Sequence, residues 1–134
     1  MNTRRDEILA TLRSWIDTLK ARDVNGHLVH YNDRLHTYYL KRNATKNQVR
    51  LDRERALSHY SSLDISLKNI QIELDPTLTR AVATFDKTWN FTGTYPSSGE
   101  VRERVWLDYA DRRWLITGER DLKLHWQKQD FRWP

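Results

Sequence analysis

Four side chains that can exchange protons lie within eight positions of one another: Tyr31, Asp33, His36 and Tyr38. A buried aspartate whose pKa is raised by desolvation can act as a general base, and a tyrosine hydroxyl can donate a hydrogen bond to a developing oxyanion. Tyr31, Asp33 and His36 are therefore the candidate catalytic set. The competing interpretation is structural, because Tyr31 continues the apolar face of a predicted helix and Asp33 can cap a turn.

Three histidines, His27, His30 and His36, are close enough in sequence to suggest a metal site. No fourth ligand has a convincing spacing, and Gly26 weakens the short helix that would bring His27 and His30 together. We therefore expect surface histidines and no bound metal. The chain has no cysteine, which excludes disulfides and thiolate chemistry. It also lacks a glycine-rich phosphate loop and a nucleophile elbow, so we expect no cofactor.

Charged residues recur along the segments with strand-like patterns: Asp86, Asp108, Glu119, Asp121, Arg102, Arg104 and Arg120. Cross-strand ion pairs on an exposed face explain such a set without any function. An inward-pointing arginine beside a carboxylate would instead mark a pocket for a polar or anionic ligand. Arg104, next to Trp106, is the candidate for that arrangement.

The net charge is +5, from 23 Lys and Arg against 18 Asp and Glu. Six of the basic residues gather in one stretch: Lys41, Arg42, Lys46, Arg50, Arg53 and Arg55. A basic helix could bind nucleic acid through phosphate contacts, and aromatic side chains could stack bases. A solvated helix face explains the same charges, and core packing explains most of the six tryptophans. Nucleic-acid binding is therefore the least favoured interpretation.

Two helices are predicted at the N-terminal end of the chain. From Ile8 to Leu19 the apolar residues have the spacing of a single helical stripe, and Thr3 with Asp6 can cap the start of that helix. A shorter helix, capped by Asp23, is predicted to end at Tyr31.

A short strand over 34–40 and a polar loop through Asn43 should follow. Thr45 then opens a third predicted helix, because its spacing to Gln48 is that of a capping box. Four apolar residues would form a narrow buried face on this helix: Val49, Ala56, Leu57 and Tyr60.

From Leu63 onward the hydrophobic period is two, which is typical of strands. The apolar residues of 63–67 and 70–74 have opposite parity, so a β-bulge near Lys68 and Asn69 is needed to keep them on one face. A long strand follows, with five apolar residues on one side: Ala81, Ala83, Phe85, Trp89 and Phe91. Two further hairpin-linked strands are predicted at 101–109 and 114–124.

Helices followed by antiparallel strands indicate an α+β fold. The 134 residues form one domain, 1–134, with a core over about 8–124 and a tail over 125–134. No stretch reaches the roughly 18 apolar residues of a membrane span. We expect a soluble protein, cytoplasmic if the chain is complete.

Several of these features together resemble the nuclear transport factor 2-like (NTF2-like) superfamily. They are the helix containing Trp15, the short helix 23–31, the strand pattern Ala81-x-Ala83-x-Phe85-x-x-x-Trp89, and the closing segment 113–119. The likeness is greatest to SnoaL-like or ketosteroid-isomerase-like bacterial domains of unassigned role. It implies a cone, also called cystatin-like, in which a strongly curved, mixed and mostly antiparallel sheet surrounds the first helix.

The resemblance also implies a pocket at the open end of the cone. The expected pocket residues are Trp15, Tyr31, Tyr38, Trp89, Arg104 and Trp106. The favoured function is non-catalytic binding of a small molecule or a peptide. Because the superfamily includes such enzymes, the alternative is a cofactor-independent isomerase, dehydratase or cyclase that uses Tyr31, Asp33 or His36.

A homodimer through the outer face of the sheet is expected as well. Trp106 has the opposite parity to Val105 and Leu107, and two or three helices cannot cover both faces of one sheet. The uncovered face is then available to a second copy of the chain.

Overall fold

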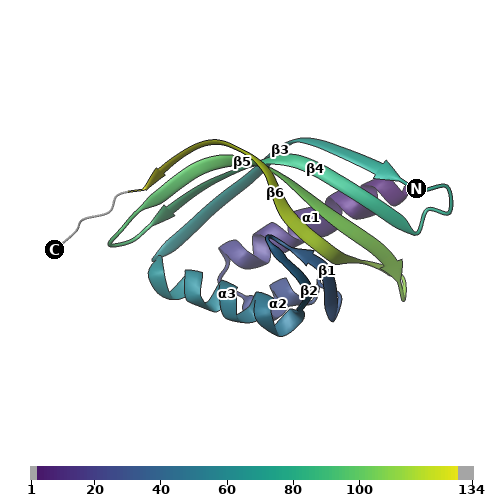
Figure 1. The fold of residues 1–134 in the computed structure, drawn as a ribbon, viewed down its shortest axis with the longest axis horizontal. Helices are drawn as coiled ribbons and strands as arrows, with labels where there is room; N and C mark the ends of the chain where they lie inside the picture. The colour runs from purple at the N-terminus through teal and green to yellow at the C-terminus, as the bar shows by residue number, and fades with distance from the viewer. Residues whose placement is uncertain (1–2, 130–134) are drawn as a thin grey trace.

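A computed structural model describes residues 3–129 of the chain. These residues form three helices and six strands, in the order drawn in Figure 1. The elements are α1 (Arg4–Lys20), α2 (Val24–Leu28), β1 (Arg34–Tyr38), β2 (Lys41–Thr45), α3 (Lys46–His59), β3 (Ser62–Leu74), β4 (Arg80–Thr92), β5 (Ser97–Ala110) and β6 (Arg113–Gln129).

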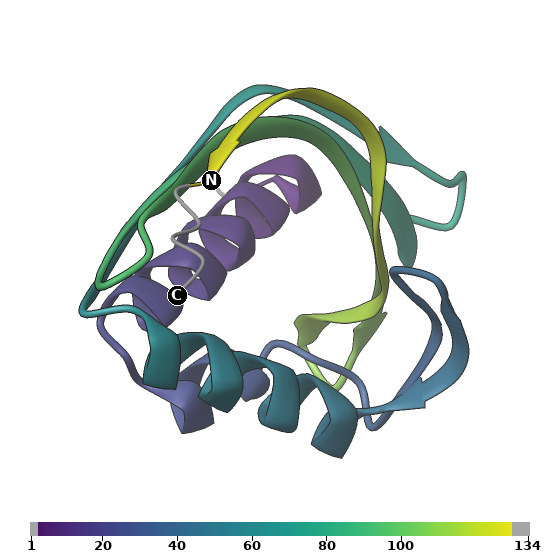
Figure 2. The same ribbon diagram turned by 60° about the vertical axis from the view of Figure 1, so that its left-hand side comes forward.

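Helix α1 begins at the predicted capping box. The Thr3 hydroxyl accepts a hydrogen bond from the Asp6 amide at 3.1 Å, and the Asp6 carboxylate accepts one from the Thr3 amide at 3.3 Å. These contacts satisfy amide groups that the helix itself leaves unpaired. The buried side of α1 is the predicted apolar stripe: Ile8, Leu12, Trp15, Ile16 and Leu19. Figure 2 shows this helix lying inside the curve of the sheet.

Helix α2 is capped by Asp23, whose side chain accepts from the Gly26 amide at 3.0 Å. The helix ends at Leu28 and not at Tyr31 as predicted. Tyr31 instead forms an isolated parallel bridge with Ile116. That strand-like contact buries Tyr31. The sequence spacing alone predicts instead that Tyr31 is buried on the face of a helix.

The predicted polar loop through Asn43 is wrong, because residues 41–45 form strand β2 and pair antiparallel with β1. Ala44 is the only fully buried residue of this strand. An edge strand with exposed polar side chains shows no alternating apolar pattern, so its sequence looks like a loop. Helix α3 then starts at the predicted capping box of Thr45 and Gln48.

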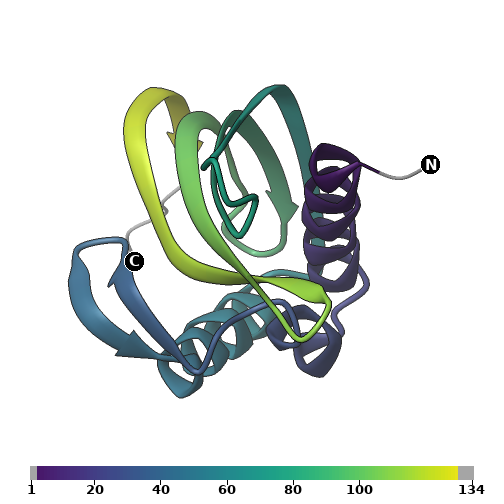
Figure 3. The ribbon, with the colours of Figure 1, turned by 90° about the vertical axis from the view of Figure 1, so that its right-hand side faces the viewer.

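The sheet has the order β2-β1-β6-β5-β4-β3. All neighbouring strands are antiparallel except β1 and β6, which pair in parallel through Thr37 with Gly118 and Tyr38 with Glu119. The predicted bulge is confirmed as a register shift between Lys68 and Gln71. Three more shifts interrupt the β5–β6 pairing, and bulges increase the local bend and twist of a strand. Figure 3 shows the resulting strong curvature.

The concave face of this sheet packs against the helices and holds the core. Along β5 the buried residues are Val101, Glu103, Val105 and Leu107, and the alternate positions point to the convex face. Trp15 of α1 is 1% exposed in this core. The mixed, mostly antiparallel sheet and the helix inside it confirm the predicted α+β cone.

Strand β6 continues to Gln129, so the first residues of the expected tail, 125–129, are strand. The rest of that tail, 130–134, lies outside the described residues. Within the described part of the chain, none of the helices combines the length and apolar character that crossing a bilayer would require.

Candidate ligand-binding site

A cavity of about 240 Å³ lies between α1, α3 and the concave face of the sheet. We call it the interior cavity. Its apolar lining consists of Trp15, Ile16, Leu19, Ala56, Leu63, Ile65, Trp89, Phe91 and Val101. Its polar lining consists of Tyr39, Arg53, Lys87 and Asp121. An apolar enclosure with a few convergent polar groups is the usual form of a small-molecule site.

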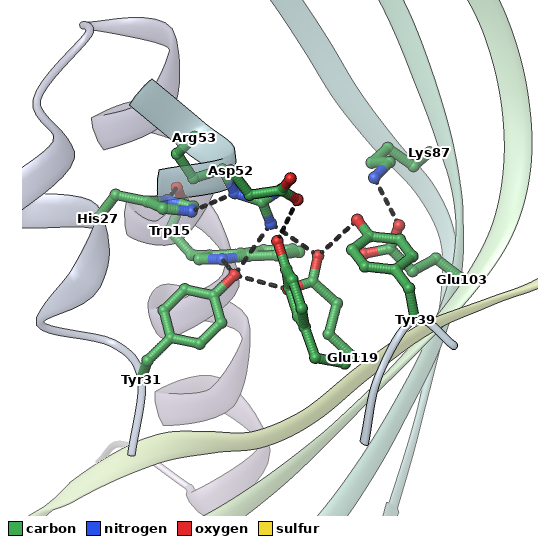
Figure 4. Close-up of polar contacts among 10 residues, drawn as sticks. Trp15, His27, Tyr31, Tyr39, Asp52, Arg53, Lys87, Glu103 and Glu119 are labelled. Atoms are coloured by element: carbon green, nitrogen blue, oxygen red, sulfur yellow. Dashed lines mark hydrogen bonds and ion pairs between the residues drawn. The ribbon is translucent and has the colours of Figure 1, made fainter. Parts of the chain in front are cut away.

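Glu119 of β6 is the centre of a buried hydrogen-bond network beside this cavity (Figure 4). Tyr31 Oη donates to Glu119 Oε1 at 2.6 Å, and Tyr39 Oη donates to Oε2 at 3.0 Å. Arg53 Nη2 donates to the same Oε2 at 2.9 Å. Burial opposes the Glu119 charge, but Arg53, Lys87 and the Tyr31 hydroxyl outweigh it and lower the pKa of this carboxyl. Glu119 is therefore an ionised and fully partnered group.

His27 connects this network to α1. Its Nδ1–H donates to the Trp15 carbonyl oxygen at 2.8 Å, while its Nε2 accepts from Arg53 Nε at 3.2 Å. Acceptance at Nε2 requires the neutral ring. Burial, together with the Arg53 charge, lowers the pKa of His27 to about 3. Trp15 Nε1 completes the network by donating to Tyr31 Oη at 2.9 Å.

Lys87 and Glu103 form a second charged group at the cavity. Lys87 Nζ lies 2.5 Å from Glu103 Oε2 (Figure 4), and Glu103 is 0% exposed. Among the described residues, Lys87 is the one partner of the Glu103 carboxylate. Burial raises the pKa of Glu103, and the Lys87 charge only partly offsets it. Burial also opposes the Lys87 charge, but Glu103 and Glu119 outweigh it and raise the pKa of Lys87.

Some of the expected pocket residues line the interior cavity and others do not. Trp15 and Trp89 line the interior cavity. Tyr31 and Tyr38 do not line it, since Tyr31 belongs to the Glu119 network and Tyr38 Oη donates to Asp52 Oδ2 at 2.6 Å. Tyr39, one residue further along the chain, provides the cavity's tyrosine.

The prediction that Arg104 and Trp106 point into the cone is wrong. They alternate along β5 with Glu103 and Val105, which are buried on the concave face, so they lie on the convex face. Arg104 Nε donates to Thr84 Oγ1 at 3.2 Å. Trp106 meets the edge of His36 with ring centroids 5.2 Å apart.

The candidate catalytic set does not assemble. Asp33 has a side chain that is 96% exposed and lies 3.6 Å from Lys46 Nζ in a surface ion pair. His36 packs on Trp106, on the opposite face of the sheet from the cavity. Only Tyr31 of the three is part of the buried network, so proton transfer by Tyr31, Asp33 and His36 acting together is excluded by their separation.

The three histidines are also apart. His27 is buried against Trp15, whereas His30 contacts Ser14 Oγ at 2.9 Å and His36 lies on the convex face. Between residues 3 and 129 there is no group of three or more His, Asp or Glu side chains that could hold a metal ion.

The charged residues Arg53, Lys87, Glu103 and Glu119 were not predicted as pocket residues. Lys87 has the parity of Phe85 and Trp89 on β4, and Glu103 has the parity of its buried neighbours on β5. A charged residue at an apolar position of a strand is a recognisable signal. Arg53 likewise follows Val49 by four positions on the predicted buried face of α3.

Several residues of the basic stretch form ion pairs within the protein. Arg53 points inward to Glu119, Lys46 pairs with Asp33, and Arg50 Nη1 lies 3.7 Å from Glu54 Oε1. These contacts reduce the positive charge that α3 offers to an anionic partner.

An α1 helix inside a bent, mostly antiparallel sheet, with a cavity at its concave face, defines the cystatin-like, NTF2-like cone. No protein-family model and no curated protein sequence matches the chain. Solved structures do match, and they share this cone, so the protein has the NTF2-like fold.

Three of these structures come from bacteria. A protein from Novosphingobium aromaticivorans, provisionally described as an aromatic ring hydroxylase, is 11% identical, with a TM-score of 0.84 over 95% of this chain and 93% of its own. A provisional scytalone dehydratase from the same organism is 12% identical, with a TM-score of 0.74 over 96% and 87%. An NTF2-like protein of unknown function from Shewanella oneidensis is 14% identical, with a TM-score of 0.66 over 89% and 98%.

Proposed function

We propose that the protein binds a small, largely apolar molecule in the interior cavity. The observation that carries this proposal is the combination of an aromatic and aliphatic lining with a lysine, Lys87, at the cavity wall. Burying apolar ligand surface against such a lining is favourable at about 25 cal/mol per Å². A domain that had no ligand would gain stability by filling this space with side chains.

The size of the cavity limits the ligand. Its volume of about 240 Å³ is just below the roughly 300–1,000 Å³ of sites for drug-sized molecules. A ligand with one or two fused rings is consistent with that volume, and Trp15 and Trp89 offer flat surfaces for ring contacts.

Binding is preferred here to isomerase, dehydratase or cyclase chemistry. The dehydratase description belongs to one of the similar structures, and 12% identity carries only the fold to this chain. Of the three residues offered for the enzymatic alternative, Asp33 and His36 lie away from the cavity, and Tyr31 is hydrogen-bonded to Glu119.

A second part of the proposal is that two copies of the chain pair through the convex face. This face carries a hollow of about 550 Å³, with Trp106 and Val82 in its lining. Half-buried apolar side chains at the centre of an open sheet face are typical of an isologous dimer interface.

Binding can be tested with 2-naphthol, a neutral two-ring probe, followed by titration in NMR spectra of the amide groups. Ala56→Phe should fill the cavity from α3 and weaken binding about ten-fold or more. Ser58→Phe, on an exposed position of the same helix, is the matched control and should bind as the unmodified protein does. Equal binding by the two variants would show that the cavity is not the site.

A further inference from the structure

Lys87 and Arg53 are both buried cations of the site, but they differ in their hydrogen-bond and ion-pair partners. Arg53 donates to His27, to Tyr31 and to Glu119. Within the part of the chain that the structure describes, Lys87 has one ion-pair partner, Glu103, and Lys87 also lines the cavity. Glu103 is buried and does not line the cavity, so Lys87 is the member of the pair that a ligand can reach.

Of the two buried carboxylates, Glu103 has fewer partners than Glu119. Glu119 accepts from two tyrosines and an arginine. Glu103 has, among residues 3–129, a single partner, the Lys87 ammonium. A buried carboxylate with one cationic partner is costly as an anion once that partner is withdrawn, and much less costly as a neutral acid.

We propose that the ligand carries one anionic oxygen group, such as a carboxylate, and that this group replaces Glu103 as the partner of Lys87 while Glu103 takes up a proton from solvent. The inference rests on the proposed binding function and names the polar end of the ligand. Apart from the O–H bond formed on Glu103, no covalent bond changes, and one proton enters for each ligand bound at a pH where unliganded Glu103 is an anion.

The charges around Glu103 favour this exchange. Glu119 and Asp121 of β6 both disfavour a negative Glu103, whereas Lys87 of β4 favours it. Tyr39 faces the same region from the end of β1, and Arg53 faces it from α3. Once a ligand anion engages Lys87, Glu103 loses the main group that stabilises its charge, and protonation follows.

Lys87 also decides the sign of the ligand. A cationic group would be repelled by Lys87 and Arg53, which outnumber the one acidic lining residue, Asp121. It would also find Glu119 already saturated by three donors. A neutral ligand can occupy the apolar part of the cavity but leaves the Lys87–Glu103 pair in place. Neutral and anionic ligands therefore differ in whether their binding takes up protons.

The test compares 2-naphthoate with the isosteric neutral 2-naphthamide by calorimetry near pH 9, above the pKa of about 8 to which burial raises Glu103, in two buffers of different ionisation enthalpy. We expect naphthoate to bind with uptake of about one proton per molecule and naphthamide with none. Lys87→Met should weaken naphthoate about ten-fold or more and leave naphthamide unchanged. Lys68→Met, which removes an exposed lysine paired with Glu100, is the control and should have no effect.

Glu103→Gln gives an independent measurement if the Lys87 variant folds poorly. A neutral, isosteric side chain at position 103 should abolish proton uptake while naphthoate still binds at least as tightly. Binding of both probes without proton uptake would overturn the anion inference and leave the cavity proposal standing. Binding of neither probe would overturn both.

Discussion

Arg53 Nη2 lies 2.9 Å from Glu119 Oε2, which connects the middle of α3 to β6 across 66 positions of sequence. The glutamate is fully buried and the arginine side chain is 12% exposed. A buried pair of this kind is not by itself a strong source of stability, but removing one partner leaves the other charge without compensation.

Glu119→Gln should therefore destabilise the fold by about 3–5 kcal/mol, because Arg53 would stay buried without its counter-charge. Urea unfolding measures this change. Asp64→Asn is the control, since it removes an exposed partner 3.6 Å from Lys20 and should cost less than about 1 kcal/mol. Similar midpoints for the two variants would contradict the assigned role of Glu119.

The pH dependence of stability should contain a contribution from His27. In the unfolded chain this ring binds a proton below its ordinary pKa of 6.5, whereas the folded protein binds it only below about 3. The unfolded state then holds more protons in this window, so stability falls as the pH falls from 6.5 toward 3.

A comparison of variants isolates that contribution. Glu103, whose folded pKa is raised, acts in the opposite direction, because its folded form holds an extra proton above its ordinary pKa. His27→Gln should change the pH slope of unfolding free energy by about 1.4 kcal/mol per pH unit relative to the unmodified protein. Equal slopes for the two proteins would show that His27 is not held neutral.

Gly99 on β5 should not tolerate a side chain. A Cβ at this position would lie 2.4 Å from the ring of Trp89 and 2.8 Å from the Trp126 carbonyl oxygen. Gly99→Ala should therefore cost about 1–3 kcal/mol in thermal or urea unfolding through overpacking. Ser98→Ala, the neighbouring position, should change stability by less than about 0.5 kcal/mol. A neutral Gly99→Ala would mean that Trp89 is free to move away from the strand.

The proposed dimer predicts a charge-sensitive convex face. Trp106→Asp places a carboxylate in the hollow that Trp106 and Val82 line, so sedimentation at micromolar concentration should show dimers for the unmodified protein and monomers for this variant. Arg112→Asp, in the exposed turn before β6, should leave the dimer intact. A monomeric unmodified protein would refute the dimer.

Local patterns account for most of the fold. The stripe from Ile8 to Leu19 determined α1, and the parity change after Leu67 determined the bulge that the structure places between Lys68 and Gln71. Both follow from the burial of one face of a regular element. Strand β2 was not predictable in this way, because its pairing with β1 involves backbone atoms and its side chains are exposed.

The candidate site was less accessible to sequence analysis. Lys87 and Glu103 occupy apolar positions of their strands and could have been found by that criterion. Glu119 could not, because the register shift between Trp106 and Leu107 changes which residues of β6 face inward. Asp33 and His36 were close in sequence to Tyr31, but proximity along the chain does not fix which face of a sheet a side chain reaches.

The parallel contact between β1 and β6 has a consequence for the order of folding. The strands β3 to β6 are joined by short hairpins, whereas Thr37 and Gly118 meet only after a loop of about 80 residues closes. Contacts of such long range are slow to form relative to local ones. The four-stranded sheet can therefore assemble before β1 docks, and Tyr39, Arg53 and Glu119 come together late, as the final step that gives the cavity its polar end.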